Sequence, residues 1–192
     1  MSTWTVFGSS EAGGSEVRNI SVLVAVGVNK AGYRETLGIE EGIKEDGSSW
    51  KNFLVRLKER GLRGTRLFIS DKCLGRLEGL GEVFPHSRWQ RCCVHFYRNI
   101  FSVIPRGRIR EVAAMLKAIH AQEDRKEAAA KVATVVRKSR EMKLAKAADL
   151  LEKDAVETLS YFAFPSEHWS GSCVKFEDEP WCSAASQTAN PR

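Results

Sequence analysis

Leu67-Phe68-Ile69-Ser70-Asp71 constrains the architecture of the chain more than any other segment. Its three apolar residues are too few for a helix and run straight into a serine and an acid, so the segment predicts a buried strand with Asp71 at its carboxyl end. Ligands of open α/β sheets gather beyond the carboxyl ends of strands. Asp71 is therefore a candidate site residue, although an acid just before a predicted helix over Leu74–Val83 also suits a helix N-cap.

The elements around this strand predict a mixed α/β sheet. Upstream, Ile20–Val28 and Tyr33–Ile39 are rich in β-branched residues and flank a turn, which indicates a β-hairpin. A helix is predicted over Trp50–Leu57 from its i, i+3, i+4, i+7 apolar spacing, with Gly61 placed to end it. Downstream, Arg88–Cys92 is typical of another strand, so helices and strands alternate along the chain.

From His95 to Phe162 the pattern changes to apolar residues at helical spacing, which predicts an all-helical segment. Breaks between its helices are expected at residues 105–107 and 121–124. Between Arg106 and Lys153 there are 13 basic and 7 acidic residues, which equals the net charge of +6 for the whole chain. A localised basic surface suggests a polyanionic partner, although such a run is also typical of a solvated helical face.

Composition excludes several classes of protein. With 192 residues, 43% of them hydrophobic, the chain is long enough to bury a core and is neither collagen-like nor wholly disordered. Its longest apolar run, Ile20–Val28, is far shorter than the ~20 residues of a membrane-spanning helix. No signal-peptide pattern marks the first residues, so a cytoplasmic location is expected. The five cysteines have no spacing typical of a disulfide framework.

Cys92 and His95 place a thiol and an imidazole three residues apart. The pair could be half of a zinc site, but no second pair stands at a familiar spacing. The alternatives are a buried structural cysteine with an orienting histidine, or a reactive thiol in the basic setting made by nearby arginines.

A set of short motifs carries a resemblance to a known family. The motifs are Ser70-Asp71, Gly75, Val83-Phe84-Pro85, Trp89-Gln90-Arg91-Cys92, His95 and Arg98-Asn99. Together they resemble the signature block of Mutator-type bacterial insertion-sequence transposases, and the resemblance extends over about residues 14–169.

The resemblance implies a ribonuclease H-like core whose Asp, Asp, Glu triad binds Mg²⁺ or Mn²⁺ in intact relatives. Asp71 matches the second acid and is the expected catalytic and metal-binding residue. The first acid should lie about a dozen residues before Val17, yet the first Asp of the chain is Asp46. The third should follow Trp169 by about ten residues, where Glu179 stands in a different context. The chain is therefore expected to be a truncated copy that does not bind metal productively.

The predicted fold is α/β: a ribonuclease H-like mixed sheet with an all-helical insertion and a disordered C-terminal tail. Four segments are expected: a flexible entry with no core at 1–16, a core fragment at 17–96, a helical insertion at 97–169 and a non-native tail at 170–192.

The predicted function is that of an inactive transposase fragment from a bacterial cytoplasm, descended from an enzyme that cleaves and joins DNA at element ends. Arg106, Arg108 and Arg110, which open the basic helical segment, are the expected contacts to DNA phosphates. Non-specific DNA, a second copy of the chain or an intact transposase is the expected partner, with no membrane. The alternative is a catalytically dead basic module that binds DNA or modulates an intact transposase.

Overall fold

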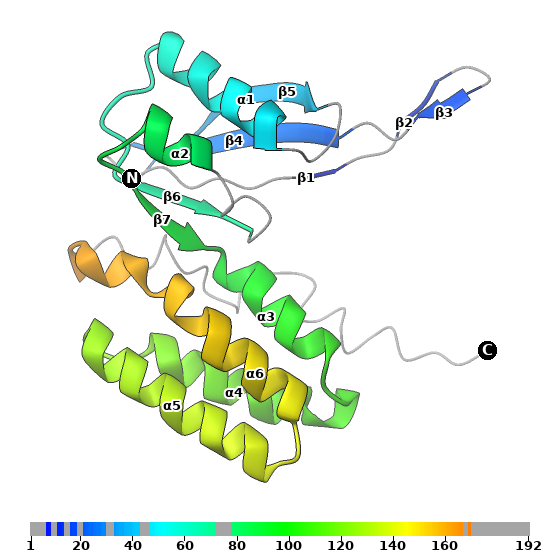
Figure 1. Ribbon diagram of the computed structural model, residues 1–192, viewed down its shortest axis with the longest axis vertical. Coiled ribbons are helices and arrows are strands. Elements are labelled where there is room, and N and C mark those ends of the chain that lie inside the picture. The colour runs from blue at the N-terminus through cyan, green and yellow to red at the C-terminus, as the bar shows by residue number, and fades with distance from the viewer. Residues whose placement is uncertain are drawn as a thin grey trace. The chain divides into compact units, whose positions relative to one another are not determined.

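The computed structural model describes residues 7–8, 11–13, 16–18, 21–29, 33–42, 47–71, 78–166 and 169 (Figure 1). Contacts divide the chain into two compact units. The first comprises Met1–Cys92 and Asp154–Ser160, and the second comprises Cys93–Lys153 and Tyr161–Arg192. Within the described ranges, none of the helices has the length and apolar character to cross a membrane. The predicted tail, residues 170–192, lies outside those ranges, and the segment boundaries expected from the sequence stay predictions.

The predicted hairpin is confirmed as strands β4 (Ser21–Val28) and β5 (Arg34–Gly42). The two strands are antiparallel, with Val24 opposite Ile39 and a register shift after Ala25. Alternate side chains of β4, including Leu23, are buried, which is the period-two pattern of a sheet with one face on the core.

Three short strands lie in or beside the segment that the sequence predicts to be flexible. β1 (Phe7–Gly8) pairs with β4 on the side away from β5, which gives the order β1-β4-β5. β2 (Glu11–Gly13) and β3 (Glu16–Arg18) form a separate antiparallel pair. Strands of two or three residues are too short to show an alternating apolar pattern, so the sequence does not predict them.

Helix α1 (Gly47–Glu59) confirms the predicted helix and covers this sheet (Figure 1). Its apolar face buries Phe53 and Leu57, and a Cβ on Gly38 of β5 would come within 3.2 Å of both side chains. A glycine there lets the helix approach the strand closely. Gly61 follows the last turn of the helix with a left-handed φ of 103°, and Leu62 donates its N–H to the Leu57 carbonyl oxygen at 2.9 Å. This is the Schellman arrangement that glycine favours.

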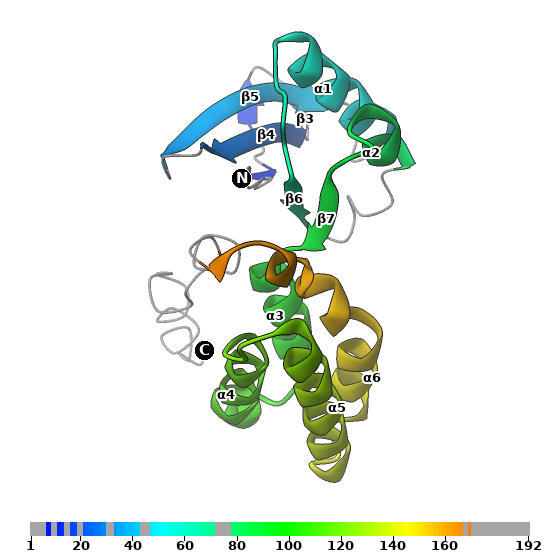
Figure 2. The same ribbon diagram turned by 90° about the vertical axis from the view of Figure 1, so that its left-hand side faces the viewer.

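The apolar segment before Asp71 forms β6 (Leu67–Ser70), and all four of its residues are buried. It pairs in parallel with β7 (Arg88–Arg91), and α2 (Glu78–Val83) lies between the two strands in sequence (Figure 2). A parallel pair needs such a crossover connection. The mixed α/β class is thereby confirmed. Among the described residues β6 pairs with β7 alone, and the ribonuclease H-like arrangement stays a proposal.

The described part of the second unit is mostly helical, as the pattern from His95 to Phe162 predicts. Its helices are α3 (Cys93–Ser102), the 3-10 turn η2 (Arg106–Arg108), α4 (Ile109–His120), α5 (Arg125–Glu141) and α6 (Ala145–Asp154). They lie side by side in both views (Figures 1 and 2). Each α-helix buries an apolar stripe, such as Val112, Leu116 and Ile119 on α4. Both predicted breaks, near 105–107 and 121–124, are confirmed.

A third break, between α5 and α6, was not predicted from the sequence. Lys143 adopts a left-handed φ of 60°, and Leu144 donates its N–H to the Ser139 carbonyl oxygen at 2.9 Å. This is the same terminal arrangement as at Gly61, but it is built on a lysine. The segment between α5 and α6 contains neither glycine nor proline, the residues that most often mark the end of a helix in a sequence. The sequence therefore does not predict this break.

After α6 the chain returns to the first unit. The last residue of α6, Asp154, and the 3-10 turn η3 (Ala155–Thr158) pack on β7. The Ser160 hydroxyl donates to the Trp89 carbonyl oxygen at 2.8 Å. A further 3-10 turn, η4, covers Ser160–Ala163. The first unit is therefore built from two stretches of chain that are distant in sequence.

Candidate catalytic site at the ends of two parallel strands

The parallel pairing of β6 with β7 places two of the predicted site residues at the same edge of the sheet. Ser70, the last residue of β6, is in register with Arg91, the last residue of β7. Asp71 and Cys92 follow these residues, and the Cys92 N–H donates to the Ser70 carbonyl oxygen at 2.7 Å. Both side chains are half-buried. The edge at which they lie is the carboxyl end of the strands, where ligands of α/β sheets bind.

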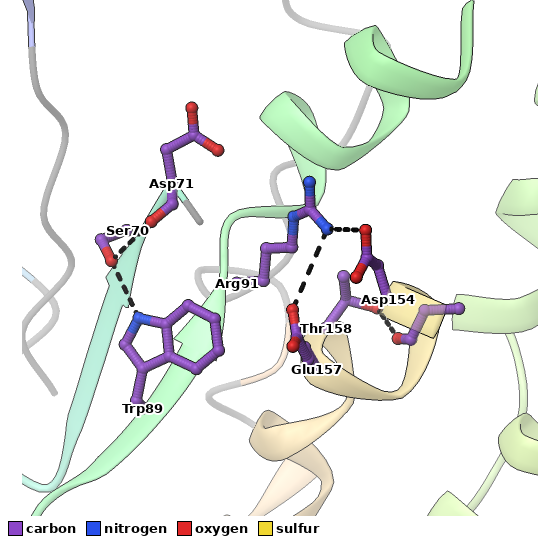
Figure 3. A network of polar contacts seen from close by, with 8 residues as sticks. Ser70, Asp71, Trp89, Arg91, Asp154, Glu157 and Thr158 are labelled. Atoms are coloured by element: carbon purple, nitrogen blue, oxygen red, sulfur yellow. Dashed lines mark hydrogen bonds and ion pairs between the residues drawn. The ribbon is translucent and has the colours of Figure 1, made fainter. Parts of the chain in front are cut away.

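The backbone before Asp71 is held by a buried polar contact. The Trp89 indole N–H donates to the Ser70 hydroxyl oxygen at 2.8 Å, and that hydroxyl donates to the Asp71 carbonyl oxygen at 3.2 Å. The Asp71 carboxylate points away from the indole (Figure 3). Trp89 and Ser70 therefore fix the strand end and leave the carboxylate outside their hydrogen bonds.

A buried ion pair lies at the end of β7. A guanidinium nitrogen of Arg91 is 2.7 Å from a carboxylate oxygen of Asp154, and the two side chains are only 3% and 4% exposed. Glu157, whose side chain is 34% exposed, approaches the same guanidinium at 3.9 Å (Figure 3). A buried cation needs such partners, since an unpaired charge in the interior costs several kcal/mol. Neither acid was predicted as a partner, because nothing local in the sequence links them to Arg91.

Cys92 and His95 are less buried than residues of a core strand would be. Strand β7 ends at Arg91, so Cys92 lies just after the strand and is half-buried, whereas Cys93 is 3% exposed. His95 lies in the first turn of α3 and is also half-buried. Its Nδ1 atom is buried and makes no hydrogen bond to the described residues. The role of the pair stays a prediction.

The described residues do not by themselves fit a two-metal centre. A survey of their His, Cys, Asp and Glu side chains finds no group of three or more that could hold a metal ion. Asp71 supplies one carboxylate, which is the right donor for Mg²⁺ or Mn²⁺ but a single ligand. The predicted positions of the other two acids, before Val17 and at Glu179, lie outside the described side chains. Within the described ranges, Asp71 is thus one donor and not a complete metal site.

Arg106, Arg108 and Arg110 lie where the second unit's basic helices begin, and all three are exposed. Arg108 forms an ion pair with Glu111 at 3.0 Å. Arg106 and Arg110 form none with the residues that the structure describes. Among the described residues, no carboxylate competes with an external anion for two of the three guanidinium groups.

The fold and the site together define a mixed α/β protein with an acid at a parallel strand end and a basic helical unit. The chain belongs to the Mutator family of transposases, because the family model described as "Transposase, Mutator family" matches residues 12–175. The resemblance seen in the sequence is thereby confirmed.

Known relatives agree with this membership. The transposase for insertion sequence element ISRM5 of Rhizobium meliloti (strain 1021) is 37% identical over 152 residues, which cover 79% of this chain and 38% of that protein. The transposase for IS1081 of Mycobacterium tuberculosis (strain ATCC 25618 / H37Rv) is 35% identical over 159 residues, with 83% and 38% covered. The chain thus spans about two fifths of the length of these relatives.

Proposed function

We propose that this chain forms part of the catalytic core of an insertion-sequence transposase with a ribonuclease H-like fold. Asp71 supplies one carboxylate for the metal-dependent cleavage and joining of DNA strands at element ends. The observation that carries the proposal is the place of Asp71: it follows β6, beside the parallel strand β7, within the region that the family model matches. Two divalent cations held by clustered carboxylates stabilise the attacking and the leaving oxygen in such reactions.

The 192 residues alone are not expected to cleave DNA. The family pattern requires two further acids, but no Asp precedes Asp46 and Glu179 stands outside the expected context. One carboxylate cannot hold two metal ions in register, and the loss of one member of a cooperating catalytic set is already severe.

A cleavage assay tests this proposal. The purified chain is incubated with supercoiled and linear duplex DNA in Mg²⁺ or Mn²⁺, next to Asp71→Ala. We expect no nicking or joining by either protein above the background of DNA without protein. Metal-dependent nicking by the wild-type chain that disappears in Asp71→Ala would contradict the proposed inactivity while supporting the role of Asp71.

A second candidate function is a DNA-binding module that modulates an intact transposase or pairs with a second copy of this chain. It is favoured by the exposed Arg106 and Arg110, which make no ion pair with the described residues. Lysine and arginine that neutralise phosphates release counterions, which makes the affinity depend steeply on salt.

Titration of a labelled duplex at several salt concentrations tests whether the chain binds DNA through phosphate contacts. If about six phosphates are neutralised, log K falls with log salt at a slope of about −5, so binding weakens about a thousandfold between ~50 and ~200 mM salt. Replacing Arg106, Arg108 and Arg110 with Gln should flatten that slope by up to about three units. Arg34→Gln, an exposed cation on β5, is the control and should leave the slope nearly unchanged. A slope of log K against log salt near zero for the wild-type chain would contradict the proposed DNA-binding function.

A further inference from the structure

The cations of helix α1 have partners that stabilise the fold. Lys51 pairs with Glu82, and Arg56 pairs with Glu40, each at 2.5 Å. Lys58 donates to the Val83 carbonyl oxygen at 2.6 Å and lies 5.8 Å from the centre of the Phe84 ring. These three side chains are therefore engaged within the first unit.

Three arginines of the same unit have no such partner among the described residues. Arg60, Arg63 and Arg88 are exposed, and their side chains form no ion pair or hydrogen bond with any residue that the structure describes. Over residues 59–66 the sequence holds three arginines and one acid, and residues 84–88 hold no acid. The local charge is therefore strongly positive and is not neutralised within this part of the chain.

Hydrogen bonds join the loops before β6 and β7, which carry Arg63 and Arg88, at one edge of the sheet. The Ser87 hydroxyl donates to the Thr65 carbonyl oxygen at 2.5 Å, and the Arg88 N–H donates to the Arg66 carbonyl oxygen at 2.9 Å. Arg63 is two residues from Thr65, so the two Cα atoms are at most about 7 Å apart. The loops that enter β6 and β7 thus run side by side, with arginines on both.

This edge is the opposite one from the candidate catalytic site. Arg88 is the first residue of β7, whereas Asp71 comes after the last residue of β6. Four residues of strand span about 13 Å, so Arg88 lies roughly that far from the Asp71 end. Arg60, Arg63 and Arg88 are named the strand-entry surface.

The chemistry of the surface favours a polyanion over a small anion. A single exposed ion pair contributes only about 0–1 kcal/mol, so exposed arginines bind firmly when one partner meets several of them. The guanidinium fork matches phosphate geometry with two parallel hydrogen bonds. Duplex DNA offers about one phosphate charge per 1.7 Å of axis.

We propose that the strand-entry surface is a second contact for the phosphate backbone of duplex DNA, separate from Arg106, Arg108 and Arg110. The choice of DNA as the partner rests on the proposed function. Because the contact is with phosphates, it positions the duplex and carries no base specificity.

The test compares two matched triple variants by salt-dependent titration of a labelled duplex. R60Q/R63Q/R88Q removes the three charges, whereas R60K/R63K/R88K keeps them. We expect the Gln variant to flatten the slope of log K against log salt by about two to three units, and the Lys variant to stay within about half a unit of wild type. Circular dichroism melting of each variant checks that the exposed substitutions leave the fold intact.

Each outcome bears on the surface or on the proposed function separately. If the Gln variant keeps the wild-type slope while the variant of Arg106, Arg108 and Arg110 loses part of it, the strand-entry surface is wrong and the proposed function stands. If both triple Gln variants flatten the slope, both contacts are supported. A wild-type chain that binds no duplex at any salt concentration, or that binds phosphatidylserine vesicles more tightly than the duplex, would overturn the surface as a DNA contact.

Discussion

Arg91 and Asp154 form a buried ion pair within the first unit. Its members are 3% and 4% exposed, so neither charge has water to replace a lost partner. Such a pair adds little net stability against an apolar pair of the same size, but breaking one side leaves a buried charge. The pair specifies where the returning segment docks on β7.

Asp154→Asn should therefore lower the free energy of unfolding by about 3–5 kcal/mol, because Arg91 loses its closest counter-charge. Urea denaturation measures the change. The double variant Arg91→Met with Asp154→Leu should recover most of the loss. Arg137→Gln is the matched control: its pair with Glu141 is 3.9 Å long and highly exposed, so the change should stay below about 0.5 kcal/mol. An Asp154→Asn variant as stable as wild type would show that Glu157 alone satisfies the arginine.

The strand end that carries Asp71 could be predicted from the sequence, whereas its surroundings could not. The signal for Asp71 is local, an apolar run followed directly by an acid. The partner of Arg91 lies more than sixty positions away in sequence, and no local pattern encodes a contact of that kind. The burial of Cys93 instead of Cys92 depends on the strand ending one residue earlier than predicted, and strand ends are poorly specified by periodicity.

Two helix ends share one geometry but are built on different residues, and only one of them was predicted. Gly61 and Lys143 both have a left-handed φ, and both are followed by a residue whose N–H bonds five positions back. The end at Gly61 was predicted because glycine adopts this conformation without a Cβ penalty. The end at Lys143 was not, because lysine gives no such signal.

A glycine at position 143 and an alanine at position 61 should change the free energy of unfolding in opposite directions. Lys143→Gly should raise the free energy of unfolding by about 0.5–1 kcal/mol, because the left-handed conformation costs a lysine roughly 1–2 kcal/mol and glycine loses part of this gain to its flexible unfolded chain. Gly61→Ala should lower it by about 1 kcal/mol, and only through its conformation, since a Cβ there meets nothing within 4 Å. Urea denaturation of both variants provides the comparison, and a destabilised Lys143→Gly would argue against strain at that turn.

The sequence predicts both the net charge of the whole molecule and the segment in which most of that charge lies. The net charge of +6 was placed in the helical segment by counting residues, and the structure leaves many of those side chains exposed. Composition does not reveal the strand-entry surface, because the segment that holds Arg60 and Arg63 meets Arg88 only when β6 pairs with β7. Their neighbouring cations in α1 are neutralised, which only the ion pairs of the folded chain show.

Binding to DNA should be insensitive to base sequence. Both proposed contacts are exposed arginines, which meet phosphates and not base edges, so they position a duplex without reading it. Competition of a labelled duplex with unlabelled duplexes of equal length, one carrying element-end sequence and one unrelated, should give dissociation constants within about threefold of each other. A preference of about a hundredfold or more for the element end would instead require base contacts, each worth about 1–3 kcal/mol.

The return of the chain at Asp154 has a consequence for synthesis on the ribosome. The acid that neutralises buried Arg91 is translated about sixty residues after it, and at roughly 5–20 residues per second the delay is ~3–12 s. During that interval the Arg91 side chain lacks this counter-charge, and burying it unpaired would cost several kcal/mol. The helices between Cys93 and Lys153 emerge first and are free of this constraint. We therefore expect the nascent α/β unit to complete its fold only after the helical segment has been made, because its two stretches of chain flank that segment.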